Sequence, residues 1–146
     1  MTTDNSRSGF TLMEVLVALI IVTILATIVG VNVIHKPGEA RVAAARVQVR
    51  TIQTALQMYK TEQGRFPTQE QGLEALCVKP TSSPVPQQYP EGGYLESRKV
   101  PVDPWNREFV YLVPGRHNEP YEVITYGSDG EPGGSGEDAD ISSSDL

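Results

Sequence analysis

The chain has 146 residues, a length that suits one domain with at most a small appendage. Its 12 basic and 18 acidic residues give a net charge of −6, which argues against nucleic acid as the main partner, because binding phosphates needs a basic surface. The single cysteine, Cys77, excludes an intramolecular disulfide and a multi-cysteine metal cluster. His35 and His117 are too far apart in sequence for a typical zinc motif.

Residues 10–34 form a long apolar segment, within which residues 15–31 carry no charge. At a rise of about 1.5 Å per residue, a helix of about 25 residues crosses a bilayer core of about 30 Å. The segment exceeds the apolar core of about 7–15 residues in a cleavable secretory signal peptide, and no small-x-small cleavage site follows it. We therefore predict a membrane-spanning helix, and the positive charge of Arg7 before it favours a cytoplasmic N terminus.

One carboxylate, Glu14, lies in the first turns of this apolar segment. An acidic side chain costs about 2.5–3.5 kcal/mol at the centre of a bilayer and less near its surface. Position alone leaves two explanations open. Glu14 is either an interfacial charge that complements the helix dipole, or a membrane-embedded charge with a partner and a function.

The Lys36-Pro37-Gly38 triplet interrupts the apolar pattern, because proline lacks an N–H donor and glycine loses backbone entropy. Beyond it, apolar residues recur at alternating spacings of three and four, which predicts an amphipathic helix over 37–63. Its predicted buried face consists of Val42, Ala45, Val49, Ile52, Leu56 and Tyr59. The pattern leaves open whether the two helices are continuous past Gly30 and Pro37.

Residues 64–146 are rich in proline and glycine. Alternating or clustered β-branched and aromatic residues predict strands at 108–113 and 121–126, joined by a turn-rich loop. An antiparallel sheet of two or three strands packed on the amphipathic helix is the economical arrangement, so the fold class is α+β. We expect Trp105 and Cys77 to pack into this small core.

The C-terminal end is acidic. After Arg116 the chain has no Lys or Arg but eight acids, and residues 129–140 combine five of these acids with four glycines. Calcium needs about six to eight oxygen ligands, which acids and turn-forming glycines can supply. The segment lacks the spacing of an EF-hand and the lysine of a phosphate-binding loop. Composition alone leaves a calcium loop and a disordered acidic linker as alternatives.

The ordered string RSGFTLME at residues 7–14 resembles the class III signal of type IV pilins and type II secretion pseudopilins. In that family an inner-membrane prepilin peptidase cuts after the glycine and methylates the new N terminus. The resemblance implies cleavage between Gly9 and Phe10 and N-methylation of Phe10. It also implies that Glu14 acts in assembly by neutralising the terminal amine of a neighbouring subunit, since neither charge is tolerated alone at low dielectric.

The same resemblance divides the chain into four parts and implies a type IV pilin-like fold. Residues 1–9 are a cleaved leader, and 10–36 form the transmembrane helix that becomes the filament core. Residues 37–63 form the amphipathic helix, and 64–146 form the periplasmic globular part.

Three further strings resemble the major pseudopilins of type II secretion systems in particular. They are GRFPT with QGLEAL within residues 64–76, VPVDPW at 100–105, and YGSDGEPGG at 126–134 with DADI at 138–141. Family members often have glycine after the tryptophan, where this chain has Asn106.

Major pseudopilins bind one calcium ion in the matching C-terminal loop. The resemblance implies Asp129, Asp138 and Asp140 as side-chain ligands, with the backbone carbonyls of Tyr126 and Ser135 as further candidates. Independently, about 80 soluble residues without a disulfide make a marginal fold. A bound ion would add its binding energy to the stability of this fold.

The resemblance implies a structural subunit rather than an enzyme, and the sequence shows no catalytic constellation. It implies a single-pass protein of the Gram-negative inner membrane with a periplasmic C-terminal domain. That protein would assemble with itself and with minor pseudopilins into a helical periplasmic filament, which helps move folded exoproteins through the outer-membrane secretin. Its other implied partners are the prepilin peptidase and the inner-membrane assembly platform.

Two alternatives remain at the sequence level. One is a type IV pilin or a minor pseudopilin, although a pilin usually has a pair of cysteines that this chain lacks. The other is a membrane-anchored calcium-binding module that is never processed. Retention of residues 1–9 in the purified protein would favour the module.

Overall fold

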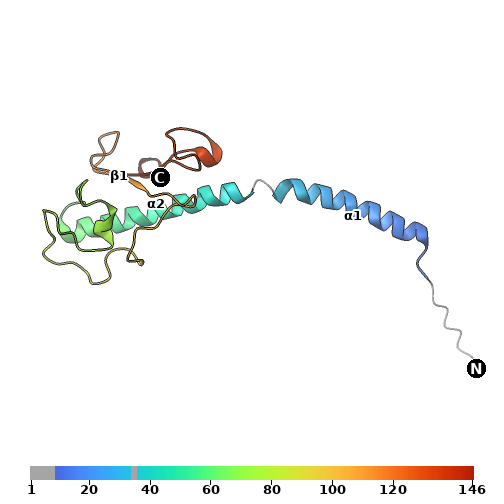
Figure 1. Cartoon of the computed structure of the whole chain (residues 1–146), viewed down its shortest axis with the longest axis horizontal. Coiled ribbons are helices and arrows are strands. Elements are labelled where there is room, and N and C mark those ends of the chain that lie inside the picture. The colour runs from blue at the N-terminus through green and yellow to red at the C-terminus, as the bar shows by residue number, and fades with distance from the viewer. Residues whose placement is uncertain (1–8, 34–35) are drawn as a thin grey trace, which may run out of the picture. The chain divides into compact units, whose positions relative to one another are not determined.

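The computed structural model describes residues 9–33 and 36–146, and the side chains of residues 9–26 and 37–146. The chain forms two units, residues 1–37 and 38–146, whose helices are labelled in Figure 1. The leader residues 1–8 and the junction residues 34–35 lie outside the described residues. The continuity of the two helices therefore stays an open prediction.

The described part of the first unit is a helix, α1 (Leu12–Val33). Thr11 begins it, because the Thr11 hydroxyl accepts a hydrogen bond from the backbone N–H of Glu14 at 3.2 Å, in the spacing of a capping box. The helix continues through Gly30, where a glycine costs only about 1 kcal/mol relative to alanine. Among the described residues, no helix is both long and apolar enough to cross a membrane.

The second unit is built on α2 (Lys36–Gln63). Pro37 lies in the first turn of α2, where a backbone N–H has no partner within the helix and its absence costs no hydrogen bond. The sequence triplet that interrupts the apolar pattern is therefore the start of a helix. Gly64 ends α2 with a positive φ of 76°, and its N–H donates to the carbonyl of Lys60 at 2.8 Å.

The predicted buried face of α2 is confirmed. Its central residues are fully buried and Val42 packs at its edge. The fully buried members are Ala45, Val49, Ile52, Leu56 and Tyr59.

The sheet has three antiparallel strands in the order β1 (Val110–Leu112), β2 (Glu122–Thr125) and β3 (Ile141–Ser142). The register pairs Tyr111 with Val123 and Thr125 with Ile141. β1 and β2 fall within the predicted strand segments. β3 is too short to show an alternating pattern, so it has no signal in the sequence.

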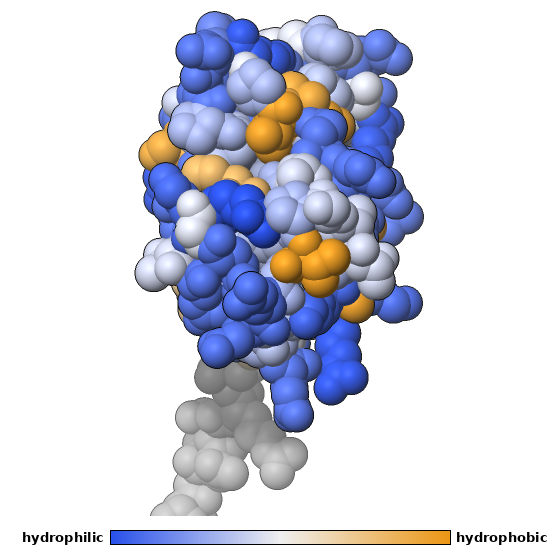
Figure 2. Space-filling view, turned by 90° about the vertical axis from the view of Figure 1, so that its left-hand side faces the viewer, coloured by the Kyte–Doolittle hydropathy of each residue, from blue (hydrophilic) through white to orange (hydrophobic). Residues whose placement is uncertain are grey.

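Three short 3₁₀ helices complete the unit: η1 (Leu73–Leu76), η2 (Gly136–Asp138) and η3 (Ser143–Asp145). One hydrophobic cluster joins the buried face of α2 to η1 and the sheet, which confirms the α+β class. Cys77 is buried in this cluster and Trp105 packs against it, as expected. Figure 2 shows one side of the unit, which is largely hydrophilic with a few separate apolar patches.

The outer edge of β1 is covered by one side chain. The amide of Gln69 donates to the carbonyl of Tyr111 at 2.7 Å and accepts from the N–H of Val113 at 2.8 Å. This is the pattern of hydrogen bonds that a neighbouring strand would make. Gln69 therefore blocks part of an edge that could otherwise pair with another chain.

Candidate assembly site and C-terminal loop

The predicted cleavage bond between Gly9 and Phe10 lies just ahead of α1, in non-helical backbone. Phe10 is 83% exposed, and a Cβ atom added to Gly9 would meet nothing within 4 Å. The fold of the chain itself therefore does not require glycine at this position. We expect any requirement for Gly9 to come from a protein that acts on the bond.

Phe10 and Glu14 lie on one side of the start of α1 and line a shallow hollow of about 380 Å³. The remaining lining residues, Val15, Ala18, Leu19 and Val22, are apolar. Glu14 is thus the charged member of an otherwise apolar surface. Such a surface suits a single cationic partner in a low-dielectric environment.

The acidic glycine-rich end forms a closed loop. The N–H of Ser128 donates to the carbonyl of Glu137 at 2.9 Å, which ties the two halves of the loop together. Gly127 and Gly134 have positive φ angles of 59° and 78°. A Cβ at Gly127 would lie 2.5 Å from the carbonyl oxygen of Glu137, and one at Gly134 would lie 2.4 Å from that of Asp138. The close approach of these backbone segments explains both glycines.

The structure places the three predicted aspartate ligands on this loop. Asp129 accepts from the N–H of Glu131 at 3.0 Å, and Asp140 accepts from the N–H of Gly133 at 2.9 Å. Among the described residues, no three Asp, Glu, His or Cys side chains are grouped closely enough to hold a metal ion. The oxygen donors fit calcium in kind, but an ion here would need backbone carbonyls among its ligands.

The two predicted carbonyl ligands take part in the turns of the loop. The carbonyl of Tyr126 accepts from the N–H of Gly130 at 3.1 Å, and that of Ser135 accepts from the N–H of Asp138 at 3.3 Å. A carbonyl oxygen has a second lone pair, so neither contact prevents coordination. The ligand set stays a prediction.

Sequence reasoning missed a buried charge next to this loop. Glu122 on β2 has a fully buried side chain, and its carboxylate accepts hydrogen bonds from the guanidinium of Arg116 at 2.9–3.2 Å. It also accepts from the backbone N–H of Arg116 at 2.9 Å and from the hydroxyl of Ser142 at 2.6 Å. These hydrogen bonds, set against the opposing effect of burial, lower the pKa of Glu122 from 4.5 to about 2.

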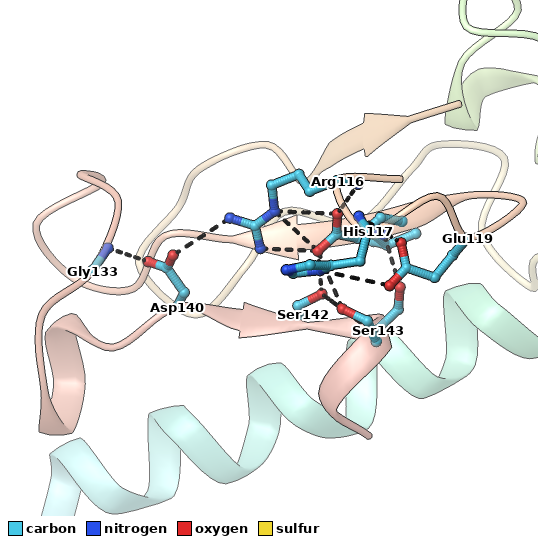
Figure 3. A network of polar contacts seen from close by, with 10 residues as sticks. Arg116, His117, Glu119, Gly133, Asp140, Ser142 and Ser143 are labelled. Atoms are coloured by element: carbon cyan, nitrogen blue, oxygen red, sulfur yellow. Dashed lines mark hydrogen bonds and ion pairs between the residues drawn. The ribbon is translucent and has the colours of Figure 1, made fainter. Parts of the chain in front are cut away.

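Arg116 joins this buried charge to the acidic loop, and Figure 3 shows its guanidinium beside Asp140. Its second terminal nitrogen, Nη1, lies 3.9 Å from Oδ2 of Asp140. One guanidinium thus lies between a fully buried acid and a predicted calcium ligand. The sequence does carry one signal for this ion pair. Arg116 is the last Lys or Arg of the chain, and it stands a short turn before Glu122, an acid within an apolar strand segment.

The lowered pKa of Glu122 predicts a specific loss of stability in acid. The ionised carboxylate stabilises the fold fully above about pH 4.5, and this contribution is lost as the pH falls toward 2. The full difference corresponds to about 3 kcal/mol. Urea unfolding of the wild-type and Glu122→Gln chains between pH 7 and pH 2 measures this contribution of the ionised carboxylate to stability. The stability gap between the two chains should narrow below pH 4.5, and a gap that stays constant would contradict the prediction.

The VPVDPW string forms a second buried polar site. Asp103 is 3% exposed, and its Oδ1 accepts from the backbone N–H groups of Trp105 at 3.0 Å and Arg107 at 2.8 Å. Its Oδ2 accepts from the hydroxyl of Thr125 on β2. Asn106 has a φ of 66°, which asparagine tolerates better than most residues other than glycine. The departure from the family pattern therefore preserves the turn.

The comparisons with known proteins agree with this architecture. Residues 4–30 match the prokaryotic N-terminal methylation motif, and residues 32–144 match the family described as type II secretion system, protein G. The type II secretion system core protein G of Pseudomonas aeruginosa is 43% identical over 94% of each chain. That of Vibrio cholerae is 42% identical over 94% of this chain and 91% of the relative.

A solved structure gives the same result. The major pseudopilin from the type 2 secretion system of enterohaemorrhagic Escherichia coli has 33% sequence identity and a TM-score of 0.62, over 74% of this chain and 90% of that chain. The fold and the methylation motif together define a pseudopilin. The chain belongs to the protein G family of type II secretion systems, the family of the major pseudopilins.

Proposed function

We propose that this chain is the major structural subunit of a type II secretion pseudopilus. The match to protein G relatives along nearly the whole chain carries this conclusion. Repeated head-to-tail contacts between identical subunits build an open helical filament, so one kind of chain suffices for its shaft. The filament helps move folded exoproteins through the outer-membrane secretin, and the chain performs no catalysis of its own.

Before assembly, the chain is anchored in the Gram-negative inner membrane by its apolar N-terminal helix, with the second unit in the periplasm. The prepilin peptidase cuts between Gly9 and Phe10 and methylates the new amine of Phe10. In the filament, this amine neutralises Glu14 of a neighbouring subunit, and the apolar hollow around Glu14 supports the pairing. Minor pseudopilins and the inner-membrane assembly platform are its further partners.

Processing is tested by the intact mass of the membrane-extracted chain, expressed with and without a prepilin peptidase. We expect the loss of residues 1–9 and the gain of one methyl group only when the peptidase is present. The Gly9→Val variant is the matched control, because the space around Gly9 is open and the fold should not change. An unprocessed mass in both hosts would instead favour a membrane-anchored module.

We also propose that the C-terminal loop binds one calcium ion through Asp129, Asp138 and Asp140, with carbonyls such as those of Tyr126 and Ser135. The oxygen-rich, glycine-hinged loop supports this proposal. The ion would stabilise the small fold by binding the folded state alone.

The Asp129→Ala variant tests this site. We expect the wild-type melting temperature to rise by several degrees when calcium replaces chelator, and the variant to lose this rise. Thermal melting of both chains, with magnesium as the control ion, gives the comparison. A wild-type melting curve that is the same in calcium and in chelator would contradict the site.

A further inference from the structure

We propose that Arg116 sets the calcium affinity of the C-terminal loop, because its guanidinium competes with the ion for Asp140 and is itself held back by the buried Glu122. This inference rests on the proposed calcium site. It assigns a role to two residues, Arg116 and Glu122, that are not among the predicted calcium ligands.

The geometry divides the guanidinium between two acids. Its Nε and Nη2 atoms make close hydrogen bonds with Glu122, at 2.9–3.2 Å. Its Nη1 atom approaches Oδ2 of Asp140 only to 3.9 Å, at the outer limit of an ion pair. The pairing with Glu122 is therefore the tighter of the two. Asp140 receives a weak cationic contact that a divalent ion can replace.

The two acids also differ in burial. Glu122 is fully buried on β2 and is held from the other side by the hydroxyls of Ser142 and Ser144, at 2.6 and 3.2 Å. Asp140 is 22% exposed in its side chain and lies where the loop returns to β3. Asp140 is therefore the acid of the two that a new cation can reach, while the buried Glu122 keeps the positive charge of Arg116 partly neutralised.

This arrangement predicts opposite effects for two variants. In Glu122→Gln the buried countercharge is lost, so Arg116 repels the ion and pairs more strongly with Asp140. The calcium affinity of this variant should be lower than that of the wild type by a factor of about five or more. In the double variant Arg116→Gln/Glu122→Gln the competing charge is gone, and the two amides can still hydrogen-bond each other. Calcium should then bind tighter than to the wild type by a similar factor.

The experiment is a calorimetric calcium titration of the full chain in detergent after removal of ions by chelator. It compares the wild type with the two variants. Glu119→Gln is the matched control. Glu119 lies in the same loop as Arg116, and its substitution removes one negative charge, as Glu122→Gln does. The described polar contacts of the Glu119 side chain are with His117 instead of Arg116. We expect this control to bind calcium within twofold of the wild type.

A purely structural role for the pair would weaken calcium binding in both variants, so shifts in the same direction would overturn the inference. Equal affinities in all four chains would also overturn it, while leaving the calcium site intact. Failure of the wild type to bind calcium at all would overturn both the inference and the proposed site. That outcome would leave the assignment as a secretion pseudopilin unaffected.

Discussion

Replacing Glu122 by alanine is expected to lower the free energy of unfolding by about 3 kcal/mol, because its buried carboxylate loses the charge-assisted hydrogen bonds from Arg116. The substitution leaves Arg116 without its main countercharge and removes the carboxylate that accepts from the hydroxyls of Ser142 and Ser144. It also empties space beneath the C-terminal segment, because the carboxylate is fully buried. Urea unfolding of the full chain in detergent measures the loss.

Trp105 is the natural reporter for this measurement, because it is the single tryptophan of the chain and packs against the core of the second unit. The control is Glu70→Ala, which removes an exposed acid and should change stability by less than about 0.5 kcal/mol. A loss below about 1 kcal/mol for Glu122→Ala would mean that water replaces the ion pair without strain. The hydrogen-bond network around Glu122 would then contribute little to the stability of the fold.

The network has a consequence for the C-terminal segment as a whole. The carbonyl of Ser143 accepts from the side chain of Gln53 on α2 at 3.0 Å, and the hydroxyl of Ser143 accepts from the N–H of Val123 at 2.9 Å. Together with the bonds of Ser142 to Glu122, these contacts fasten the end of the chain to both α2 and β2. These protein contacts hold the C-terminal segment against the core of the second unit.

The parts of the fold that could be predicted from the sequence depend on periodic patterns. The buried face of α2 follows a spacing of three and four, so Ile52 and Tyr59 could be placed in the core without a structure. The glycine at position 64 marks the end of α2 for an equally local reason, its positive φ. Local rules of this kind need no knowledge of distant residues.

The full buried site could not be predicted, because Ser142 reaches Arg116 and Glu122 only from the far side of a long loop. Arg116 precedes β2, Glu122 lies on it, and Ser142 follows a long loop. An acid in a strand is normally placed on the solvent side by the alternation of side chains. Glu122 is buried instead because its hydrogen-bond partners meet around it, and this convergence is a property of the tertiary fold alone.

Replacing Asp103 by alanine is expected to cost about 2–4 kcal/mol, since it leaves one buried and two partly buried donors without an acceptor. The carboxylate accepts from the N–H groups of Trp105 and Arg107 and from the hydroxyl of Thr125, so it joins the turn to β2. The carbonyl of Val102 next to it accepts from the side chain of Gln48 on α2 at 3.1 Å. Asp103 thus fixes a loop that spans the helix and the sheet.

Two further variants separate the contributions of Asp103. Asp103→Asn keeps one carbonyl oxygen to accept from the turn, so it should lose about half as much stability as Asp103→Ala. Thr125→Val removes only the bond to β2 and should cost about 1 kcal/mol. Urea unfolding gives the three values, and Trp105 fluorescence reports the turn directly. Equal losses for the Asn and Ala variants would show that the oxygen kept by asparagine, which accepts from the turn, contributes little, and this would make the bond to Thr125 the principal one.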